Sequence, residues 1–415
     1  MSTPSALPIQ GVLQPYAWGG TDYLARFLHR PNPAGEPQAE YWMGAHAKGP
    51  AELIGHDRTL DNYVAADPEG VLGTAVARRF DDRLPFLFKV LDVKDMLSIQ
   101  VHPTKDAAEK GFAAEEANGP ERTAPNRNYR DDNHKPELGV ALTDFYLLHG
   151  FKDSAAIEIS LNTVPGWSEL LPALRSDGVA GLYGHVMALG QADLNELLQP
   201  LVDSLGPESD YSRDQPEFWA SRAVQQYSEG GRHDRGLFSI YWFNIVHLRP
   251  GEGIFQDAGI PHAYLEGVCL ELMANSDNVL RGGLTPKHID VPELLDKTSF
   301  DPVSPAIITP DRADRAAAAR PNDEAGTAST WHRYATPAPD FQLYETQANP
   351  GGTIEVDTAG GPAILLLLMG SARCTDEDWG MDEEQRTVFV PAGRAFTLRA
   401  GERGVVIYRA GVGES

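Results

Sequence analysis

The sequence predicts a mainly β protein of 415 residues with a helical insertion near its middle. Up to about residue 150, short apolar or alternating segments are separated by Gly, Pro and Asp, which is typical of strands. Between 152 and 240 the apolar residues recur at spacings of three and four, the period of an amphipathic helix. The strand pattern returns after 240, so we expect the helices to interrupt one β domain.

The individual elements follow from these patterns in chain order. The expected strands of the first part are LPFLFKVLDV (84–93), MLSIQVHP (96–103) and FYLLHGF (145–151). The expected helices include ADLNELLQPLVDSL (192–205) and PEFWASRAVQQY (216–227), whose leading Pro suits a first helical turn. Strands are expected again at LFSIYWFNIVHLRPGEG (237–253), PAILLLLMG (362–370) and RTVFVPAG (386–393).

The resulting domain organisation has four parts. Residues 1–151 and 241–309 form the main β domain, 152–240 the helical insertion, 310–335 a linker and 336–415 a small C-terminal β domain. The linker prediction rests on the segment PDRADRAAAARPNDEAGTAST, which is rich in Ala, Pro and charge and short of large apolar side chains.

The composition indicates a soluble globular chain. With 42% hydrophobic residues it can bury a large core. Its net charge of −24 disfavours nucleic acid and anionic membranes as partners, because these are bound through surplus Lys and Arg. Cys269 and Cys374 are too few for a disulfide framework, and no apolar run approaches the ~20 residues of a membrane span. We expect a cytoplasmic monomer.

A polar pair stands in the segment SIQVHPTK. Residues two apart on a strand share a face, so Gln100 and His102 point together. Leu97, Ile99 and Val101 then point the other way, and Ile99 and Val101 are core. One interpretation is that the polar pair occupies the solvated face of an antiparallel sheet, and the other is that it binds a metal.

A second segment favours the metal. The stretch GEGIFQDAGIPHAY resembles the second metal-binding motif of the cupin superfamily, with its glycines and His262 matched and Asp257 in place of the usual proline. QVH is then a variant of the first cupin motif, with Gln100 in place of the leading His. A cupin is a double-sheet jelly roll, and its inward-facing side chains converge on one metal. The resemblance therefore implies that Gln100, His102 and His262 meet.

Two imidazoles and an amide need an anionic partner to offset a divalent cation, and DDNHKPELG offers Glu137. Pro136 excludes a helix interior here, and Glu137 opens an apolar run. By itself Glu137 is more simply explained as a surface strand residue, but the other candidate ligands favour the metal. One carboxylate with mixed nitrogen and oxygen donors suits zinc, and manganese, cobalt and iron use similar donors.

Longer motifs resemble those of the type I phosphomannose isomerases, which are zinc enzymes of the cupin superfamily. In chain order they are YAWGG, EYWMGAHAKGPAEL, QVHP, NHKPE, PHAYLEG and ELMANSDNVLRGGLTPKHIDVPELL. The resemblance covers most of residues 10–300. It implies one zinc ion per chain, held by Gln100, His102, Glu137 and His262. It also implies that mannose 6-phosphate and fructose 6-phosphate are interconverted through an enediol(ate).

The resemblance further implies a substrate region, formed by Lys89, Ser98, His134, Lys135, Glu271, Arg281 and Lys287. The four basic residues among these would supply the positive charge that an anionic sugar phosphate requires. Lys89 also interrupts an apolar run, which is unusual for a solvated lysine. Trp18 and Tyr264 are candidates for shaping the pocket, and Trp42 for the core.

The catalytic roles are assigned by chemistry. Glu271 is the first candidate for the general base, followed by Lys135 and His134, and Arg281 is expected to stabilise the enediolate. Three alternatives stay open. The chain could be a cupin that only binds a sugar phosphate, it could be an iron-dependent cupin oxygenase, or Arg281 could be structural and paired with Asp277.

Overall fold

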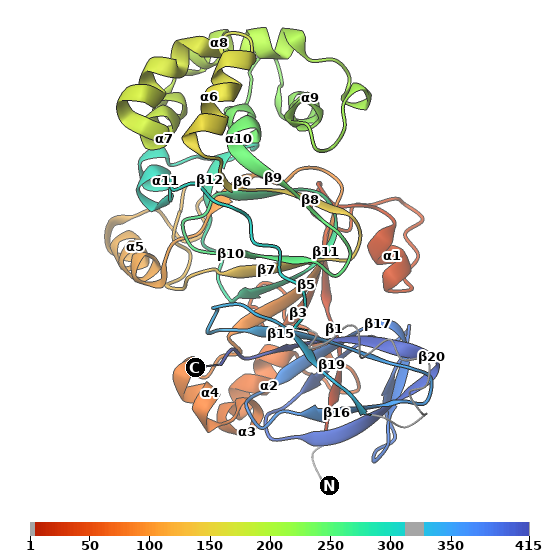
Figure 1. The fold of residues 1–415 in the computed structure, drawn as a ribbon. Coiled ribbons are helices and arrows are strands. Elements are labelled where there is room, and N and C mark those ends of the chain that lie inside the picture. Colours follow the sequence, from red (N-terminus) through yellow and green to blue (C-terminus); the bar gives the residue numbers. More distant parts are fainter. Residues whose placement is uncertain (1–4, 312–327, 415) are drawn as a thin grey trace.

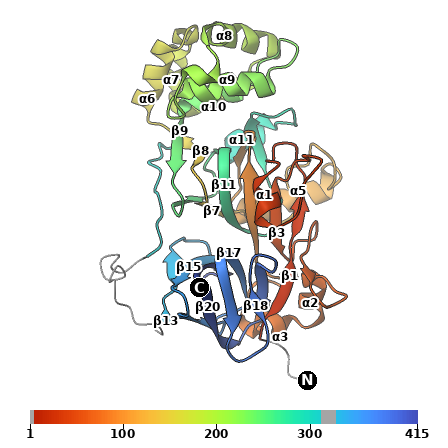
Figure 2. The ribbon, with the colours of Figure 1, turned by 90° about the vertical axis from the view of Figure 1, so that its right-hand side faces the viewer.

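The computed structural model describes residues 5–311 and 328–414. Within these residues the chain forms two β-sheets and a group of helices, arranged one above the other with the first sheet in the middle (Figure 1). The view turned by 90° shows the same order (Figure 2). Most of the predicted linker, residues 312–327, lies outside the described residues.

The first sheet is antiparallel and is organised around one long strand. Its ten strands in the described residues are β2 (Val12–Gln14), β3 (Glu40–Gly44), β5 (Phe86–Val93), β6 (Ile99–Val101), β7 (Glu137–Ala141), β8 (Phe145–Phe151), β9 (Phe243–Leu248), β10 (Gly253–Gln256), β11 (His262–Ala274) and β12 (Leu280–Gly283). The first part of β11 pairs with β6 and β8, and its second part pairs with β5 and β7. Strands from both sides of the helical segment therefore meet on β11.

A bulge in β11 turns both parts of this strand toward one interior. His262 and Tyr264 share a face, whereas Glu271, at an odd spacing, would point the other way on a regular strand. The register shifts between Tyr264 and Glu266, and the extra residue reverses the alternation. Gly267 follows with a φ of 119°, and a Cβ there would lie 2.4 Å from a neighbouring carbonyl oxygen. As a result, His262, Tyr264 and Glu271 line the same cavity.

Strand β5 is buried on both faces, which explains its nearly continuous apolar sequence. Lys89 and Leu91 face the cavity, whereas Phe88 and Val90 pack in the core shared with the C-terminal sheet. Lys89 is thus a charged residue on an inward face, as its place in an apolar run indicated.

The alternation predicted for residues 97–102 holds only within β6. Ile99 and Val101 are fully buried, as predicted. Leu97 was expected to point away from Gln100, but both line the same cavity. The prediction for Leu97 was wrong because β6 begins at Ile99, so the two-residue period does not extend back to it.

The helical group covers one end of the first sheet (Figure 1). Its elements are α6 (Ser154–Thr163), η1 (Trp167–Leu170), α7 (Leu171–Ala188), α8 (Gln191–Ser204), η2 (Glu208–Asp210), α9 (Pro216–Tyr227) and α10 (Gly236–Trp242). The strand predicted for 237–242 was wrong, because this segment is α10. All residues of α10 are buried, and a short helix that is apolar on every side cannot be distinguished from a buried strand by periodicity.

The remaining helices flank the sheets. They are α1 (Tyr23–Phe27), α2 (Leu60–Ala66), α3 (Pro68–Leu72), α4 (Thr74–Arg79), α5 (Lys105–Asn118) and α11 (Val291–Lys297). Among the described residues, no helix combines the length and the apolar character required to cross a membrane.

The second sheet contains most of the C-terminal strands. Its ten strands in the described residues are β1 (Leu7–Gln10), β4 (Glu52–Leu53), β13 (Ala328–Ser329), β14 (His332–Tyr334), β15 (Gln342–Ala348), β16 (Thr353–Asp357), β17 (Ala363–Cys374), β18 (Gly380–Met381), β19 (Thr387–Val390) and β20 (Ala395–Gly411). Its pairs are antiparallel except β13 with β16. β1 pairs with β19, so the two ends of the chain share this sheet.

Candidate metal centre

Three side chains converge inside the first sheet. His102 follows β6, Glu137 begins β7 and His262 begins β11. All three are buried, and their candidate ligand atoms lie within 4.8 Å of one another. Nε2 of each histidine lies 3.4 Å from a carboxylate oxygen of Glu137. A carboxylate between two imidazoles is a donor set that suits a divalent transition metal.

The far nitrogens of both imidazoles are held by backbone carbonyl groups. Nδ1 of His102 lies 2.9 Å from the carbonyl oxygen of Asn278, and Nδ1 of His262 lies 2.9 Å from that of Ile260. A carbonyl oxygen only accepts, so each Nδ1 carries the proton and each Nε2 presents a lone pair. Nε2 of His102 is buried and has no hydrogen-bond partner among the described residues. These features are typical of metal-binding histidines.

Gln100 supplies a fourth donor at the same place. It is the residue of β6 that stands opposite His262 in the ladder, and both line one cavity. The structure therefore brings the four predicted ligands together around a small volume. Because Glu137 is the single carboxylate among them, a bound divalent cation keeps a net positive charge.

Charges around Glu137 determine its ionisation. The ammonium of Lys135 lies 2.9 Å from its carboxylate. Burial alone would raise the pKa of Glu137, but Lys135 and His102 hold that pKa well below its usual range. Burial lowers the pKa of His102 to about 4, against the opposing pull of Glu137. At neutral pH the site therefore holds an ionised carboxylate and a neutral His102.

A second charged group lies deeper on the same interior face. The ammonium of Lys89 lies 2.7 Å from the carboxylate of Glu271 and 3.3 Å from that of Glu40. Burial opposes the charge on Lys89, but these two carboxylates raise its pKa above the usual value. Burial raises the pKa of Glu271, although Lys89 opposes this shift. Two buried acids thus share one cation.

These residues enclose a cavity of about 60 Å³. It is lined by Glu40, Lys89, Leu91, Leu97, Gln100, Lys135, Glu137, His262, Ala263, Tyr264 and Glu271. Such a volume holds an ion and one or two water-sized groups. The hydroxyl of Tyr264 is buried beside it and has no hydrogen-bond partner among the described residues. An unpaired buried donor on a cavity wall is available to a ligand oxygen.

Comparison with known proteins identifies the family. Residues 6–154 match the family model described as phosphomannose isomerase type I, catalytic domain. The mannose-6-phosphate isomerase of Escherichia coli (strain K12) is 42% identical over 296 residues, which cover 70% of this chain and 73% of that one. That of Homo sapiens is 34% identical over 399 residues, or 89% of each chain. The chain belongs to the type I phosphomannose isomerase family.

Solved structures extend this likeness to nearly the whole chain. The structure described as mannose 6-phosphate isomerase (holo; zinc bound) has a TM-score of 0.83 at 32% identity and covers 99% of this chain and 100% of that one. The apo form from Salmonella typhimurium has a TM-score of 0.82 at 31% identity, with the same coverage. The family predicted from the sequence motifs is therefore confirmed.

Positive charge gathers beside the four predicted ligands. Arg281 stands opposite Gln100 in the pairing of β12 with β6. Burial lowers its pKa, and Arg130 adds to that shift. Burial likewise lowers the pKa of Lys287, followed by the effects of Arg281 and Arg130. The three cations therefore influence one another, and neither Arg281 nor Lys287 forms an ion pair in the described part of the chain.

The structural alternative for Arg281 fails. Its expected partner, Asp277, lies 2.8 Å from the ammonium of Lys48 and 3.7 Å from Nε2 of His46. Asp277 therefore has other cations, and in the described part of the chain no carboxylate pairs with Arg281.

Other predicted residues lie outside the small cavity. Ser98 and Trp18 are partly buried but do not line it, and Trp18 packs against the nearby apolar core. Nε2 of His134 lies 2.7 Å from Asp340, on the side of the second sheet. Trp42 is buried as predicted, and its indole nitrogen donates to Glu40 at 2.6 Å.

Sequence reasoning missed three residues of the candidate site. Glu40 lines the cavity and shares Lys89 with Glu271. Asn278 orients His102 through its carbonyl, and Arg130 adds charge near Arg281. Glu40 and Asn278 stand within motifs that carried the family resemblance, which was the available signal. For Arg130 the signal was its place next to DDNHKPE.

Proposed function

We propose that this protein is a zinc-dependent isomerase that interconverts mannose 6-phosphate and fructose 6-phosphate. The observation that carries the proposal is the meeting of two imidazole nitrogens with the Glu137 carboxylate. Arg281 and Lys287, which form no ion pair among the described residues, add positive charge nearby. The zinc-bound relative and the named isomerases of the same family support it. A metal beside positive charge suits a phosphorylated sugar.

The metal has four proposed ligands, Gln100, His102, Glu137 and His262. A zinc ion held by these residues would supply a Lewis acid that polarises substrate oxygens. The protein's own part is to fix the tautomer of each neutral imidazole, with the proton on Nδ1 held by the carbonyl group of Asn278 or Ile260, so that Nε2 faces the metal position. Lys135 balances Glu137 and stands where it can also contact a substrate oxygen.

The isomerisation moves a proton between two carbons. A base removes the proton from C2 of the open-chain aldose, and the electrons of that bond form the enediolate. The proton returns to C1, while the hydroxyl proton of C2 moves to the oxygen of C1. We assign the carbon proton to Glu271, because burial raises its pKa toward the range in which it can both take and return a proton. Lys135 remains the second candidate.

The other basic residues near the site differ in whether a carboxylate already neutralises them, and we assign their roles accordingly. Lys89 is neutralised by Glu271 and Glu40, so it is not free for the phosphate as the sequence suggested. Lys287 and Arg130 supply two positive charges for the phosphate dianion. Arg281 stands opposite the proposed ligand Gln100 and stabilises the enediolate.

The architecture is part of the same proposal. The main β domain, residues 1–151 and 241–309, is a cupin jelly roll built on the first sheet, and a helical lobe at 152–240 interrupts it. Residues 336–415 form a C-terminal, cupin-like β domain, and β1, β4, β13 and β14 extend its sheet. The protein acts as a cytoplasmic monomer.

One assay tests the function. Purified protein is supplied with mannose 6-phosphate, and fructose 6-phosphate is measured by a coupled reaction before chelation, after chelation and after zinc is restored. We expect formation that is lost with the metal and recovered with zinc. Binding of the sugar phosphate without turnover would instead indicate a binding cupin, and oxygen consumption with an iron-loaded protein would indicate an oxygenase.

A further inference from the structure

One contact joins the loop of the candidate site to the second sheet. Nε2 of His134 lies 2.7 Å from Oδ2 of Asp340, which is 3% exposed. Asp340 lies in the connection between β14 and β15. His134 directly precedes Lys135, whose ammonium lies 2.9 Å from Glu137. The second sheet thus contacts the chain one residue away from a wall of the site.

Asp340 is held firmly by its own surroundings. The guanidinium of Arg79 donates to the carbonyl oxygen of Pro339 at 3.0 Å. Phe341 is fully buried in the core shared by the two sheets. The side chain of Gln342 donates to the carbonyl oxygen of Tyr334 at 2.5 Å. The carboxylate of Asp340 therefore has a fixed position, and a side chain that bonds to it is fixed as well.

The loop itself turns adjacent side chains in opposite directions. Pro136 follows Lys135, and the residue before a proline is restricted to extended conformations. Successive side chains of an extended chain point to opposite sides. His134 accordingly points to Asp340 while Lys135 lines the cavity. A tether on His134 thereby limits where the ammonium of Lys135 can move.

The start of the loop is fixed by a separate network. The hydroxyl of Ser276 donates to Asp131 at 2.8 Å, and the amide of Asn278 donates to the carbonyl oxygens of Asp131 and Asn133 at 2.7 and 2.9 Å. These bonds end before His134. In the segment between Asn133 and Pro136, it is the side chain of His134 that contacts the region of the second sheet, through Asp340.

We propose that Asp340 is a positioning residue of the isomerase, which acts through His134 to hold Lys135 beside Glu137. The inference rests on the proposed function and gives the C-terminal β domain a part in it. On this view His134 acts as a tether to the second sheet, and its effect on turnover passes through Lys135.

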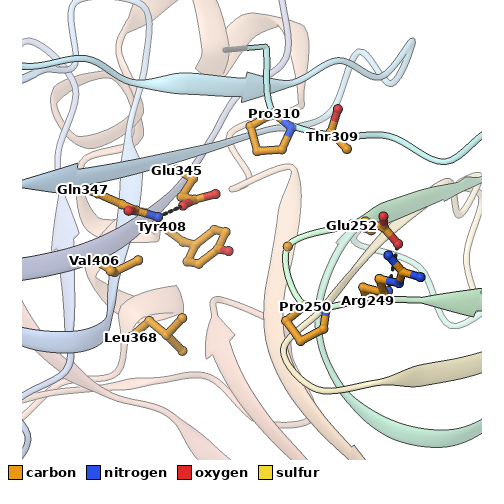
Figure 3. Close-up of a pocket in the computed structure, with 11 residues that line it drawn as sticks. Arg249, Pro250, Glu252, Thr309, Pro310, Glu345, Gln347, Leu368, Val406 and Tyr408 are labelled. Carbon is orange, nitrogen blue, oxygen red and sulfur yellow. Dashed lines mark hydrogen bonds between the residues drawn. The ribbon is translucent and has the colours of Figure 1, made fainter. Parts of the chain in front are cut away.

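The two sheets do not simply pack together everywhere along their boundary. A cavity of about 620 Å³ separates the turn between β9 and β10 from the strands of the second sheet. Figure 3 shows Tyr408 and Glu345 on one side of it, facing Pro250 and Arg249 on the other. A contact such as that of Asp340 is therefore a local feature of the boundary.

A matched control lies on the same boundary. The hydroxyl of Tyr334 donates to the carbonyl oxygen of Gly251 at 3.0 Å. Tyr334→Phe removes this contact between the sheets, together with the hydrogen bond of the same hydroxyl to Glu345 at 3.3 Å, but leaves His134 untouched. It measures what the loss of an ordinary boundary contact does to stability and to turnover.

The test is a double-mutant cycle in the zinc-loaded, full-length protein with Asp340→Ala, His134→Ala and both together. We expect Asp340→Ala to lower kcat by about 10- to 100-fold, as loss of a supporting contact typically does. Zinc content should stay at one per chain. Asp340→Asn, which keeps an acceptor oxygen, should recover most of the activity. The double variant should be no slower than His134→Ala alone, because both changes break one contact.

Three outcomes would overturn the proposal. The first is a wild-type kcat in Asp340→Ala. The second is a fall in kcat of the double variant that equals the product of the two single falls. The third is an equal fall in kcat in Tyr334→Phe when the two variants have the same melting temperature. The NMR signal of the His134 ring, assigned by its absence in His134→Ala, should shift in both Asp340 variants without any need for turnover. If the wild type forms no fructose 6-phosphate, the proposed function fails, and the ring signal still tests the tether by itself.

Discussion

The two sheets have the same number of strands in the described residues but differ in what they enclose. The first sheet surrounds Lys89, Glu137 and Glu271 together with the two histidines of the metal centre. The interior of the second is filled by apolar side chains such as Leu365, Leu367 and Val388. Its region contains two buried carboxylates, Asp340 and Glu345, and both lie at the boundary with the first sheet.

This difference separates stability from chemistry. An isolated buried charge costs several kcal/mol, so buried charges persist where partners or a metal compensate for them. In the first sheet Lys89 is compensated by Glu271 and Glu40, and Glu137 by Lys135. The interior of the second sheet gains its stability from apolar burial. The two buried carboxylates of its region lie at the boundary and have polar partners there, His134 for Asp340 and Tyr334 for Glu345. The charged interior thus marks the site, and the apolar interior supports the fold around it.

The largest effect is expected from removing a metal ligand. His262→Ala should lose zinc and reduce activity by more than the 10- to 100-fold typical of residues that only support a ligand. Metal content and kcat should fall together, and His102→Ala should behave alike. Full zinc occupancy with normal turnover in either variant would contradict the assignment of this metal centre. The contrast between the two sheets would then also fail.

A core substitution in the second sheet should instead lower stability and leave activity unchanged. Leu367 is fully buried in the apolar core, so Leu367→Ala should lower the free energy of unfolding by about 2–5 kcal/mol. The kcat of the folded enzyme and its zinc content should be unchanged. Denaturant unfolding and kinetics at low temperature measure both quantities. A large loss of kcat in a fully folded Leu367→Ala enzyme would show that the apolar interior is not merely supportive.

Arg281 sharpens the comparison because it is a cation of the first sheet without a carboxylate partner. Arg281→Ala should lower kcat by about 10- to 150-fold, the equivalent of one charge-assisted hydrogen bond of about 1.5–3 kcal/mol. KM should change little if the guanidinium stabilises the enediolate. If the guanidinium instead binds the phosphate, its removal would raise KM. The melting temperature should stay near that of the wild type. Unchanged kcat and KM would exclude both roles.

The sequence predicted the features that depend on local pattern. Alternation around Gln100 and the family motifs led to four proposed ligands that the fold brings together, and the apolar run around Lys89 indicated its burial. Pattern failed at α10, where a helix buried on every side looks like a strand. It also could not show that the bulge in β11 brings Glu271 to the face of His262, because an inserted residue reverses the alternation without a clear signal in composition.

Contacts between segments that are distant in the sequence could not be predicted from local sequence patterns. Nothing near Leu7 shows that β1 pairs with β19, since the partner lies almost the full length of the chain away. The pairing of His134 with Asp340 is of the same kind. Such contacts depend on the assembled cores of both sheets, so they emerge from the fold and not from either segment.

The smallest expected effect concerns Asp92, which lies on β5 with Lys89 but outside the cavity. It is buried without an ion pair among the described residues, and burial raises its pKa to about 6. The folded state therefore holds this proton more tightly than the unfolded state. The resulting stability is present below about pH 4, the usual pKa of the carboxyl, and is lost as pH rises through 6.

Asp92→Asn keeps the neutral form at every pH, so it should be more stable than the wild type above pH 6 and equal to it near pH 4. Because the carboxyl is partly open to solvent, we expect a gain of about 1–2 kcal/mol, with kcat unchanged. Thermal unfolding of both proteins from pH 4 to 8 measures the difference. A variant that is less stable at pH 8 would mean that this charge is compensated after all. A gain would show that two charges on one strand have opposite effects. Lys89 is retained by two carboxylates, whereas Asp92 accepts from the backbone of Tyr23 and forms no ion pair among the described residues.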